Sequence, residues 1–493
     1  MEKKYYPTIG LEIHAELKTQ TKMFCGCKND PDEENPNVNI CPVCMAHPGT
    51  LPVINKKAVE NVIKVGLALG GDIADFTEFD RKNYFYPDIP KGFQISQYKY
   101  PIVSGGHLAG FDITRVHLEE DTANNKHIDF PEVELRGISP KFNFGESGYS
   151  LVDFNRAGVP LMELVTEPHT FNEAETAAKS ASNFAKELQL ILWYLGVSEA
   201  NMEKGEMRVE ANISVSEDKN KLGTKVEVKN LNSFKSVEKA IKFELDRMIE
   251  LFENGKENEI IQETRGWDEG KQKTFSQRKK ESSQDYRYFP EPDLPKMKLH
   301  EAFDLKKMKK ELPELPQAKR LRYKNDFGIK DEDIESYIND IDLAKWFEGV
   351  AKELIHKDSI KILSNYITSD YLGLKKNNPD IKLPSVKNFS ELISLVKENK
   401  ISSRATKDIL AMIVLKDESP LKIATEKNLL QKNDEGALKE IAQKIIVSNQ
   451  KVVADYKGGK EQALMSLVGQ IMKETKGSAN PSIAKQILID LLK

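Results

Sequence analysis

Clean alternation of apolar and polar residues is the feature that most constrains the fold of this chain. In residues 8–17, one face of a predicted strand carries Leu11, Ile13, Ala15 and Leu17, and the other carries Glu12, His14 and Glu16. Residues 206–215 repeat the pattern, residues 218–223 (DKNKLG) supply a hairpin connection, and residues 225–229 continue into the next strand. The sequence therefore predicts half-buried antiparallel strands whose second face is polar.

Two helices are indicated among these strands. Thr170 and Glu173 form a capping-box pattern before an apolar run that ends at Gly196, a typical C-cap residue. A second periodic run extends from about Ser236 to Gly255. Strands interleaved with a few helices favour an α+β fold, in which an antiparallel, strand-rich cradle precedes an all-helical part.

The domain organisation follows from where the periodicity changes. The chain has 493 residues, which is enough for about three domains. Periodicity fails between Gln262 and Pro295, where polar, aromatic, basic and proline residues predict a long functional loop followed by a linker. We therefore expect a catalytic cradle domain with a cysteine cluster in residues 1–295, a helical connecting segment in 296–345, and a helical domain and tail in 346–493.

Charge and composition exclude several classes of protein. The chain has 73 Lys and Arg against 77 Asp and Glu, a net charge of −4, which argues against a polybasic nucleic-acid binder but allows a local basic patch. Residues 401–493 carry 15 basic and 11 acidic residues, a net +4, so residues 1–400 carry −8. This difference either arises by chance or separates an acidic part that holds metal from a basic part that touches phosphate.

The sequence shows no sign of a membrane or secreted protein. No apolar stretch reaches the roughly 18 residues of a membrane helix. Residues 1–18 lack the apolar segment of a signal peptide. We expect a cytoplasmic protein with no membrane partner.

All four cysteines fall in one short region. Cys25 and Cys27 form one close pair, Cys41 and Cys44 form another, and 13 residues separate the pairs. Such pairs on short turns are typical of tetrahedral Zn²⁺ sites, and four thiolate ligands leave no position for water, so the site would be structural rather than catalytic. The alternative is four unliganded thiols in a reducing compartment.

Acidic residues on predicted strands suggest a second metal site. Glu12 and His14 share one face of their strand, roughly 7 Å apart. Hard cations such as Mg²⁺ prefer carboxylate oxygens and often bind substrate phosphates as well. Further acids stand on strands that could join this one, namely Glu119, Glu120, Asp121, Asp153, Glu163, Glu206 and Glu210. Taken alone, each acid is better explained by a solvated strand face, and the metal interpretation gains weight only if these polar faces converge in one concave surface.

Basic residues near these acids allow two interpretations. Arg208, Lys225 and Lys229 could bind phosphate oxygens or could form cross-strand ion pairs. The stretch from Arg265 to Phe289 mixes Arg, Lys, Trp and Tyr, as a platform for single-stranded nucleic acid does, or it is an ordinary exposed loop. The chain lacks a P-loop, a Rossmann glycine fingerprint, a G-x-S-x-G elbow and a Gly/Ser-rich amidase stretch.

An ordered set of motifs resembles one protein family. Along the chain these are IGLEIHAELKT, CPVC, HPGTLPVIN, FDRKNYFYPDIPKGFQISQY, VHLEEDTAN, VDFNRAGVPLMELVTEP, EKGEMRVEANISV, KVEVKNLNSFKSVEKAI, QETRGWDEGKQKT, DYRYFPEPDLP and SLVGQIMKETKGSANPSIAKQIL. Together they span nearly the whole chain. The sequence closely resembles the GatB family, the B subunits of tRNA-dependent amidotransferases that act on misacylated Glu-tRNA(Gln) or Asp-tRNA(Asn).

The resemblance implies a heterotrimer and a two-step reaction. An amidase-type A subunit would release ammonia from glutamine, and a small C subunit would complete the complex. The cradle of the B subunit would use ATP and Mg²⁺ to phosphorylate the side-chain carboxylate of the misacylated amino acid, and ammonia would then displace phosphate. The helical part would correspond to the family's connecting domain and its YqeY-like domain, which bind the tRNA elbow.

The same resemblance assigns roles to individual residues. The metal set it implies is Glu12, His14, Glu120, Glu163 and Glu210; the catalytic set is Glu12, His14, Arg208 and Glu210; Lys225 and Lys229 would bind the ATP phosphates. Of the adjacent pair, Glu120 aligns better than Glu119, which requires a bend or bulge in the strand. The stretch 127–147 is longer than its family equivalent.

Two other functions compete with this one. A pure tRNA-binding scaffold would use zinc and the tail for binding and leave the acidic faces solvated. The related archaeal paralogue, specific for Glu-tRNA(Gln), carries an extra inserted domain, and no such insertion is visible in 493 residues.

Overall fold

The computed structural model describes residues 4–128, 149–279, 286–354, 356–431, 435–475 and 479–492. The chain divides into two compact units, Met1–Pro316 and Gln317–Lys493. The division into three parts at residues 295 and 345 stays a prediction. The stretch 127–147 lies outside the described residues, apart from its first two positions.

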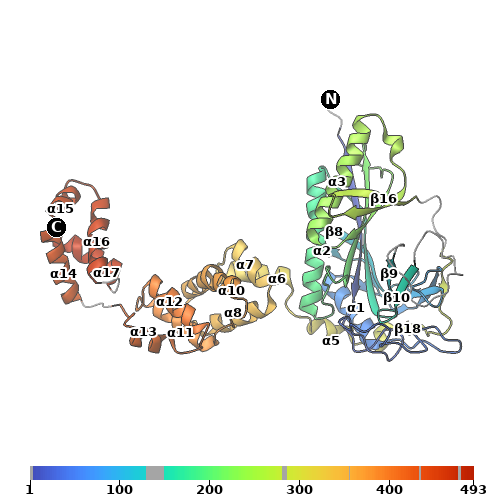
Figure 1. Cartoon of the computed structure of the whole chain (residues 1–493), viewed down its shortest axis with the longest axis horizontal. Coiled ribbons are helices and arrows are strands. Elements are labelled where there is room, and N and C mark those ends of the chain that lie inside the picture. Colours follow the sequence, from blue (N-terminus) through green and yellow to red (C-terminus); the bar gives the residue numbers. More distant parts are fainter. Residues whose placement is uncertain are drawn as a thin grey trace, which may run out of the picture. The chain divides into compact units, whose positions relative to one another are not determined.

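An eleven-stranded sheet forms the centre of the first unit (Figure 1). Its strands, in spatial order, are β16 (Lys273–Lys279), β15 (Glu263–Asp268), β14 (Val226–Leu231), β13 (Met207–Ser216), β1 (Tyr6–Glu16), β11 (Pro160–Thr166), β8 (Phe111–Glu120), β6 (Val103–Ser104) and β2 (Asp72–Ile73). Two short strands join this path, β12 (His169–Thr170) beside β1 and β7 (His107–Leu108) beside β8. All pairings are antiparallel except that of β14 with β15. The predicted α+β class is confirmed.

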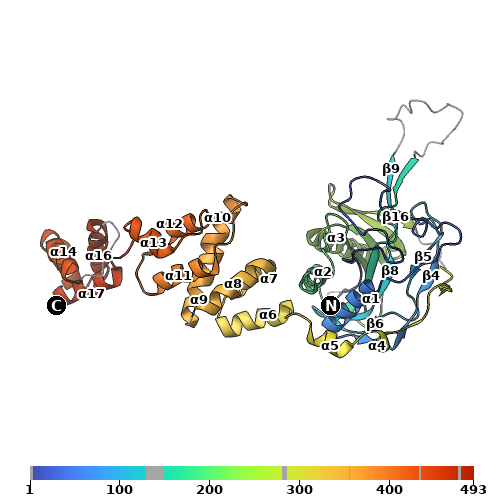
Figure 2. The same ribbon diagram turned by 90° about the horizontal axis from the view of Figure 1, so that it is seen from below.

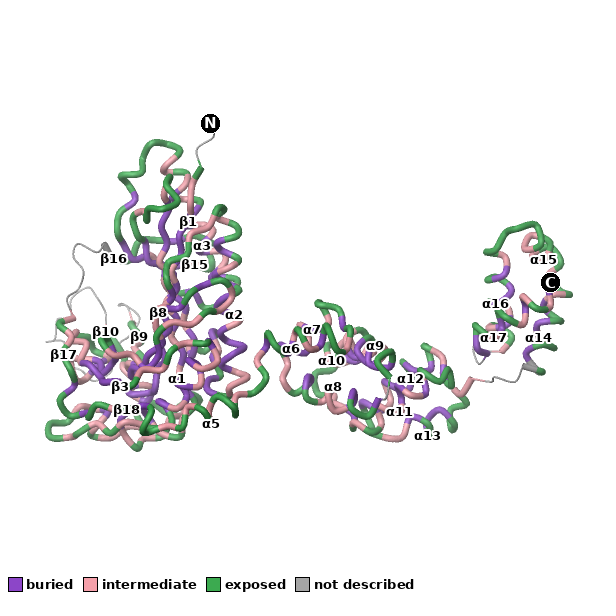
Figure 3. Tube along the Cα trace, turned by 180° about the vertical axis from the view of Figure 1, so that it is seen from behind, coloured by how far each residue is buried: buried purple, intermediate pink, exposed green. Residues whose placement is uncertain are grey.

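Helices cover one face of this sheet, as Figures 1 and 3 show. They are α1 (Lys56–Leu69), which contacts β8, α2 (Ala174–Leu195), which contacts β1, and α3 (Phe234–Glu253), which contacts β13. The apolar residues predicted to point inward, including Leu11, Ile13 and Ala15, are buried in the core that these helices complete. We call the other face of the sheet, which carries Glu12 and His14, the open face.

Smaller elements pack around the sheet. They are β3 (Phe76–Thr77) paired with β18 (Met297–Lys298), the three strands β5 (Phe93–Ser96), β4 (Asp80–Asn83) and β17 (Phe289–Pro290), the hairpin β9–β10 (Asn124–Ile128 and Tyr149–Asp153), a 3₁₀ turn at Glu257–Glu259, and the short helices α4 (Leu299–Ala302) and α5 (Leu305–Lys310). Figure 2 shows β4 and β5 side by side at one edge of the unit, and the hairpin β9–β10 extending from it.

The predicted capping box at the start of α2 is wrong. Thr170 lies in β12, where its hydroxyl is 2.9 Å from that of Thr8, and α2 begins only at Ala174. Glu173 occupies the N-cap position without a side-chain cap bond. The strand pairing of Thr170 with β1 takes precedence over the local capping pattern. The C-cap at Gly196 is confirmed, with a φ of 65°.

The prediction of a long loop between residues 262 and 295 is also wrong over much of its length. Residues 263–279 form the hairpin β15–β16. Its basic and aromatic residues pack against α3, since Arg265 pairs with the buried Glu244 at 3.3 Å and Trp267 is buried in the core. These contacts remove Arg265 and Trp267 from any exposed nucleic-acid platform.

The second unit is helical throughout the residues that the structure describes. Its elements are α6 (Pro316–Arg322), a π turn (Tyr323–Phe327), α7 (Asp331–Ile338), α8 (Ile341–Glu353), α9 (Lys357–Asn365), a second π turn (Tyr366–Tyr371), α10 (Leu372–Asn377), α11 (Val386–Lys397), α12 (Ser403–Ile413), α13 (Pro420–Glu426), α14 (Glu435–Ser448), α15 (Gln450–Lys457), α16 (Gln462–Glu474) and α17 (Pro481–Leu492). The last four helices have an apolar core of their own, which includes Leu438, Leu467 and Leu488. Among the described helices of the chain, none is long and apolar enough to cross a bilayer.

Candidate functional site

Strand register aligns charged side chains across the open face. Directly paired residues of antiparallel strands share a face, and the register pairs His117 of β8 with Glu163 of β11, Glu163 with His14 of β1, and His14 with Arg208 of β13. Glu12, two residues before His14, pairs in turn with Glu210. One row of four strands therefore brings together residues that are far apart in the sequence.

These side chains form a tight group that we call the carboxylate–histidine cluster, consisting of Glu12, His14, His117, Glu119 and Glu163. The Nε2 atom of His14 lies 3.9 Å from a Glu12 oxygen, 3.6 Å from one of Glu119 and 3.4 Å from one of Glu163. The Nε2 atom of His117 lies 3.5 Å from the same oxygen of Glu163. Three carboxylates therefore converge on two imidazoles.

Crowding and burial shift the ionisation of the cluster. Burial raises the pKa of Glu12 to about 7, and the negative charge of Glu163 adds to the shift. Burial likewise raises the pKa of Glu119. Burial alone would lower the pKa of His14, but its hydrogen bond to Glu163 and the neighbouring carboxylates outweigh it and raise the value to about 9. The three shifts share one origin, because three carboxyl groups crowd around one largely buried imidazole.

The donor atoms are spaced as ligands of a small cation. Glu12, His14 and Glu163 each offer one ligand atom within 4.8 Å of the others, and so do His117, Glu119 and Glu163. Octahedral Mg²⁺ with bonds near 2.1 Å separates its ligands by about 3.0 Å (adjacent) to 4.2 Å (opposite). The separations of 3.4–3.9 Å around His14 lie between these two values, so small side-chain shifts would bring the atoms to a common ion. Glu163 belongs to both groups, as a bridging carboxylate does.

The structure does not bring Glu120, which the resemblance implied as a metal ligand, into the cluster. Pairing of β8 with β11 runs without a shift from His117 to Glu120, so no bulge turns Glu120 toward His14. Its carboxylate instead accepts hydrogen bonds from the amide of Ile95 at 2.8 Å and from Lys91 at 2.6 Å. Because side chains alternate along β8, Glu119 lies on the same face as His117 and belongs to the cluster. The same alternation, read from the sequence, would have identified both residues.

Two of the three predicted cations, Arg208 and Lys229, lie beside the cluster, and both are held in ion pairs. Arg208 donates to Asp121 at 2.8 Å. Lys229 lies 2.8 Å from Glu210 and 3.3 Å from Glu227, so Glu210 is neutralised beside the cluster rather than within it. Lys225 is exposed and precedes the first residue of β14. The sequence had left ion pairing and phosphate binding open, and ion pairing is what Arg208 and Lys229 do in the described structure.

Lys82 is a functional candidate that sequence reasoning missed. Burial alone would lower its pKa, but the carboxylates of Glu119 and Glu163 raise it above the ordinary value. It stands in the FDRKNYF motif, whose β4 strand brings it to the cluster. Its position in that motif was the only signal, since nothing in the strand pattern relates β4 to β1.

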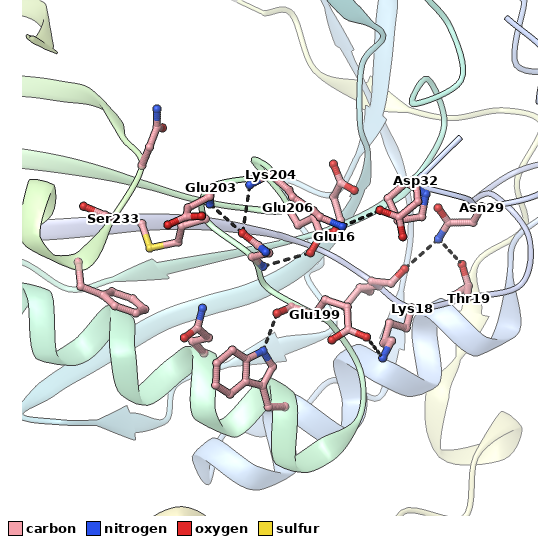
Figure 4. Close-up of a pocket in the computed structure, with 18 residues that line it drawn as sticks. Glu16, Lys18, Thr19, Asn29, Asp32, Glu199, Glu203, Lys204, Glu206 and Ser233 are labelled. Carbon is pink, nitrogen blue, oxygen red and sulfur yellow. Dashed lines mark hydrogen bonds and ion pairs between the residues drawn. The ribbon is translucent and has the colours of Figure 1, made fainter. Parts of the chain in front are cut away.

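A polar pocket of about 780 Å³ lies where β1 ends (Figure 4). Glu16, which follows Glu12 and His14 on the same face, lines it together with Glu206. Much of the charge in the pocket is already paired, since Lys18 contacts Glu199, and Lys204 lies 2.6 Å from Asp32. Burial and the neighbouring Asp121 raise the pKa of Glu16 to about 8. The row of titratable groups therefore continues from the cluster into this pocket.

The four cysteines gather as their spacing predicted. Their Sγ atoms all lie within 4.8 Å of one another, and Cys44 Sγ is 4.0 Å from that of Cys27 and 3.9 Å from that of Cys41. Tetrahedral Zn²⁺ with bonds of 2.3 Å separates its sulfurs by about 3.8 Å. The hydrogen bond from Cys25 and the backbone N–H of Cys41 help lower the pKa of Cys44 to about 5, against the effect of burial. The cluster is compatible with zinc.

Both units of the chain match families of known proteins. Residues 7–304 match the family described as the GatB/GatE catalytic domain, and residues 345–492 match the GatB domain. The chain is 40% identical over 504 aligned positions to the B subunit of the aspartyl/glutamyl-tRNA(Asn/Gln) amidotransferase of Gloeothece citriformis, covering 98% of this chain and 97% of that one. The protein of the same name from Thermotoga maritima is 42% identical over 502 positions, with 99% of each chain covered. The B subunit of the chloroplastic/mitochondrial glutamyl-tRNA(Gln) amidotransferase of Sorghum bicolor is 41% identical over 497 positions, covering 97% of this chain and 86% of that one.

Asp121 generates a prediction about stability. It is a buried carboxylate that pairs with Arg208 at 2.8 Å and with Arg156 at 3.7 Å. Asp121→Asn leaves two guanidinium groups without their charge partner, and we expect a loss of about 3 kcal/mol, the low end for a broken buried pair because both arginines are partly exposed. Urea unfolding followed by tryptophan fluorescence measures it, in a Trp346→Phe background in which only Trp193 and Trp267 of the first unit report.

Asp112→Asn is the matched control, since that carboxylate is 77% exposed and pairs with His107 on the surface. Its removal should change stability by no more than about 0.5 kcal/mol. Equal losses in the two variants would contradict the view that Asp121 balances the arginines.

Proposed function

The chain belongs to the GatB family, and from this we propose that its open face amidates the side-chain carboxylate of an amino acid misacylated onto tRNA. It is the B subunit of a tRNA amidotransferase, an ATP-dependent ligase complex of several subunits that acts on tRNA. The substrates we propose are Glu-tRNA(Gln), Asp-tRNA(Asn) or both, and the products Gln-tRNA(Gln) and Asn-tRNA(Asn). The observation that carries the proposal is the convergence of Glu12, Glu119 and Glu163 on His14.

The reaction needs activation of a poor electrophile. A carboxylate has no good leaving group at neutral pH, so transfer of the γ-phosphoryl group of ATP to one of its oxygens gives an acyl phosphate and ADP. Ammonia then attacks the acyl carbon and the C–O bond to phosphate breaks. The proton that the nitrogen loses passes to the departing phosphate, which leaves as hydrogen phosphate, and the amide remains on the tRNA. Most of the protein's work in such a transfer is to position the reactants and to stabilise charge.

The cluster supplies the ligands for a cation. Glu12, His14, Glu119 and Glu163 would hold Mg²⁺, which when bound neutralises charge on the ATP phosphates. Glu210 acts on the reaction by orienting Lys229, and Arg208 is oriented by Asp121. We assign Lys229, Lys82 and Arg208 to phosphate oxygens in the ATP-bound protein, and we keep the exposed Lys225 as a further phosphate-binding residue.

The ammonia must come from another subunit. All four cysteines of the sequence lie in one cluster and the sequence has no G-x-S-x-G elbow, which supports a separate source of ammonia. We propose an amidase-type A subunit as the source and a small C subunit as the third member of a heterotrimer. The helical second unit would bind tRNA, and we place the complex in the cytoplasm.

The cysteine cluster would hold one structural Zn²⁺. Four thiolates at tetrahedral separations fill every coordination position, so the ion would fix the loops that carry residues 25–44 rather than take part in the reaction. Lys22 supports this assignment, because its buried ammonium lies 3.9 Å from Cys44 Sγ and offsets part of the thiolate charge.

Loss of one cluster carboxylate should abolish ATP use. We expect Glu12→Gln and Glu163→Gln to lower tRNA-dependent ADP release by at least about 100-fold, since even outer-shell partners of a metal commonly cost 10- to 100-fold. Raised Mg²⁺ should partly restore Glu12→Gln. The measurement is ADP release by the assembled complex, with misacylated tRNA, in Mg²⁺ and in EDTA.

Glu60→Gln, which alters an ion pair of α1 with Lys57 and Lys64, is the control and should leave turnover unchanged. Persistence of tRNA-dependent ADP release in both cluster variants would remove the metal site from the open face. Absence of ADP release from the wild-type complex with either misacylated tRNA would favour a binding scaffold instead.

Metal analysis tests the cysteine cluster separately. We expect one zinc per purified chain, loss of that zinc in Cys27→Ser/Cys44→Ser, and retention in Thr50→Ser of the adjoining loop. Because ligand binding to the native state adds to folding stability, a strong chelator should lower the unfolding temperature of the wild type but not that of the double variant. Full zinc content in the double variant would contradict the assignment.

A further inference from the structure

Four tyrosines from two distant segments form a continuous row next to the carboxylate–histidine cluster. The rings of Tyr98 and Tyr288 are stacked, with centroids 4.4 Å apart and planes 11° apart. Tyr288 meets Tyr286 edge to face at 6.0 Å, and Tyr286 meets Tyr84 in the same way at 6.3 Å. Such edge-to-face and stacked pairs stabilise one another and hold the rings in fixed orientations. We call this row the tyrosine platform.

Backbone contacts hold the platform in place. The segment that carries Tyr286 and Tyr288 is fixed to β4 by Asn83, whose amide side chain donates to the carbonyls of Tyr286 and Arg287 at 3.1 and 2.9 Å. Arg287 adopts a left-handed conformation with a φ of 44°, which a non-glycine residue takes only when its surroundings impose it. On the other side, the amide of Tyr98 donates to Asp80 of β4 at 2.9 Å. The rings are therefore preorganised.

The platform adjoins the cluster through one side chain. The ammonium of Lys82 lies 5.1 Å from the centre of the Tyr286 ring. The same ammonium interacts electrostatically with Glu119 and Glu163 of the cluster and with Tyr288 of the platform. A molecule bound on the platform would therefore be separated from these carboxylates by about the length of one side chain, that of Lys82.

Exposure and charge indicate what the platform binds. Tyr98 is 60% exposed, and the neighbouring Phe85 and Tyr86 are 91% and 59% exposed. Lys99 and Arg287, next to the stacked rings in sequence, are also exposed. The other three tyrosines of the platform are partly buried, so it presents one exposed ring, that of Tyr98, supported from behind and flanked by cations. Single-stranded nucleic acids stack their bases on such rings while the cations meet the phosphates.

We propose that the 3′-terminal bases of the aminoacyl-tRNA stack on the tyrosine platform through the outer face of Tyr98. This inference rests on the proposed function, because the amino acid is esterified to the terminal ribose, and its carboxylate must reach the cluster while the base lies close by. ATP would occupy a single slot for one adenine. Two further exposed rings, Phe85 and Tyr86, directly follow Tyr84 of the platform in the sequence, and this number of rings suits several bases of one strand better than a single adenine.

Binding measurements on the assembled complex test the platform without any turnover. We compare tRNA that ends in CCA with tRNA that lacks the terminal adenosine and ends in CC, using uncharged tRNA(Gln) and tRNA(Asn). One stacked base is worth about 1–3 kcal/mol, so the wild type should bind the CCA form at least about fivefold more tightly. Tyr98→Leu should bring this ratio close to one. Tyr98→Phe keeps the ring and should behave as the wild type does.

Two further readouts separate the alternatives. Phe275→Leu removes a ring that is exposed elsewhere, on β16, and should keep the wild-type ratio. The KM for ATP in tRNA-dependent ADP release should be the same in Tyr98→Leu as in the wild type. A raised KM for ATP with an unchanged ratio of tRNA affinities would show that the platform holds the adenine of ATP, and would overturn the proposal.

Other outcomes are equally decisive. A wild-type ratio near one, or a wild-type ratio retained in both Tyr98→Leu and Tyr288→Leu, would overturn the platform while leaving the amidation chemistry intact. Failure of the amidation proposal is recognised separately, as absence of tRNA-dependent ADP release from the wild-type complex. A lost ratio in Tyr98→Leu with a retained ratio in Tyr98→Phe would establish stacking, since a merely structural role for Tyr98 would not alter one tRNA form alone.

Discussion

The site depends on a sheet that packs an apolar core on one face and carries charged side chains on the other. One face packs Leu11, Ile13 and their neighbours against α2 and α3, and because side chains alternate, this packing fixes Glu12 and His14 on the other face. The fixed positions bring three carboxylates within 4 Å of one imidazole and leave them partly desolvated. Burial and mutual repulsion raise the pKa of Glu12 and Glu119, because negative charge on these carboxyl groups is costly there. Binding of a divalent cation would relieve that cost, which is how a rigid scaffold prepares a site.

Period-two alternation explains how much of this arrangement could be predicted. It identified β1 and β13, the faces of Glu12, His14 and Arg208, and the antiparallel pairing with β14. It also places Glu119 rather than Glu120 on this face, whereas the choice of Glu120 followed the family motif and not the strand geometry. The hairpin β15–β16 was missed because its residues pair with α3 through charge, as Arg265 does with Glu244, and such contacts produce no apolar pattern. Thr170 was misassigned because strand pairing over a long sequence distance outweighs a local cap.

Residues of β4 and of the segment 286–290 show what a strand pattern cannot reveal. Lys82 and the tyrosine platform come from segments that are distant in the sequence, joined by the pairing of Phe289 with Arg81 and by the hydrogen bonds of Asn83. The sequence drew attention to the aromatic and basic character of the second segment. Its partner on β4 had no signal beyond a motif, since two-residue pairings such as β17 with β4 are too short to leave a periodicity.

One loop serves both clusters of the first unit. The buried Lys22 contacts Cys44 Sγ at 3.9 Å and the carbonyl oxygen of Phe154 at 3.1 Å, so it joins the cysteine cluster to the loop after β10. Two residues further on, Arg156 donates to the carbonyls of Thr122 and Ala123 and pairs with Asp121, which in turn holds Arg208 on the open face. Each contact depends on the position of the same few backbone atoms. The geometry of Arg208 beside His14 therefore requires the packing of a loop that the cysteine cluster also requires, although the two clusters share no ligand.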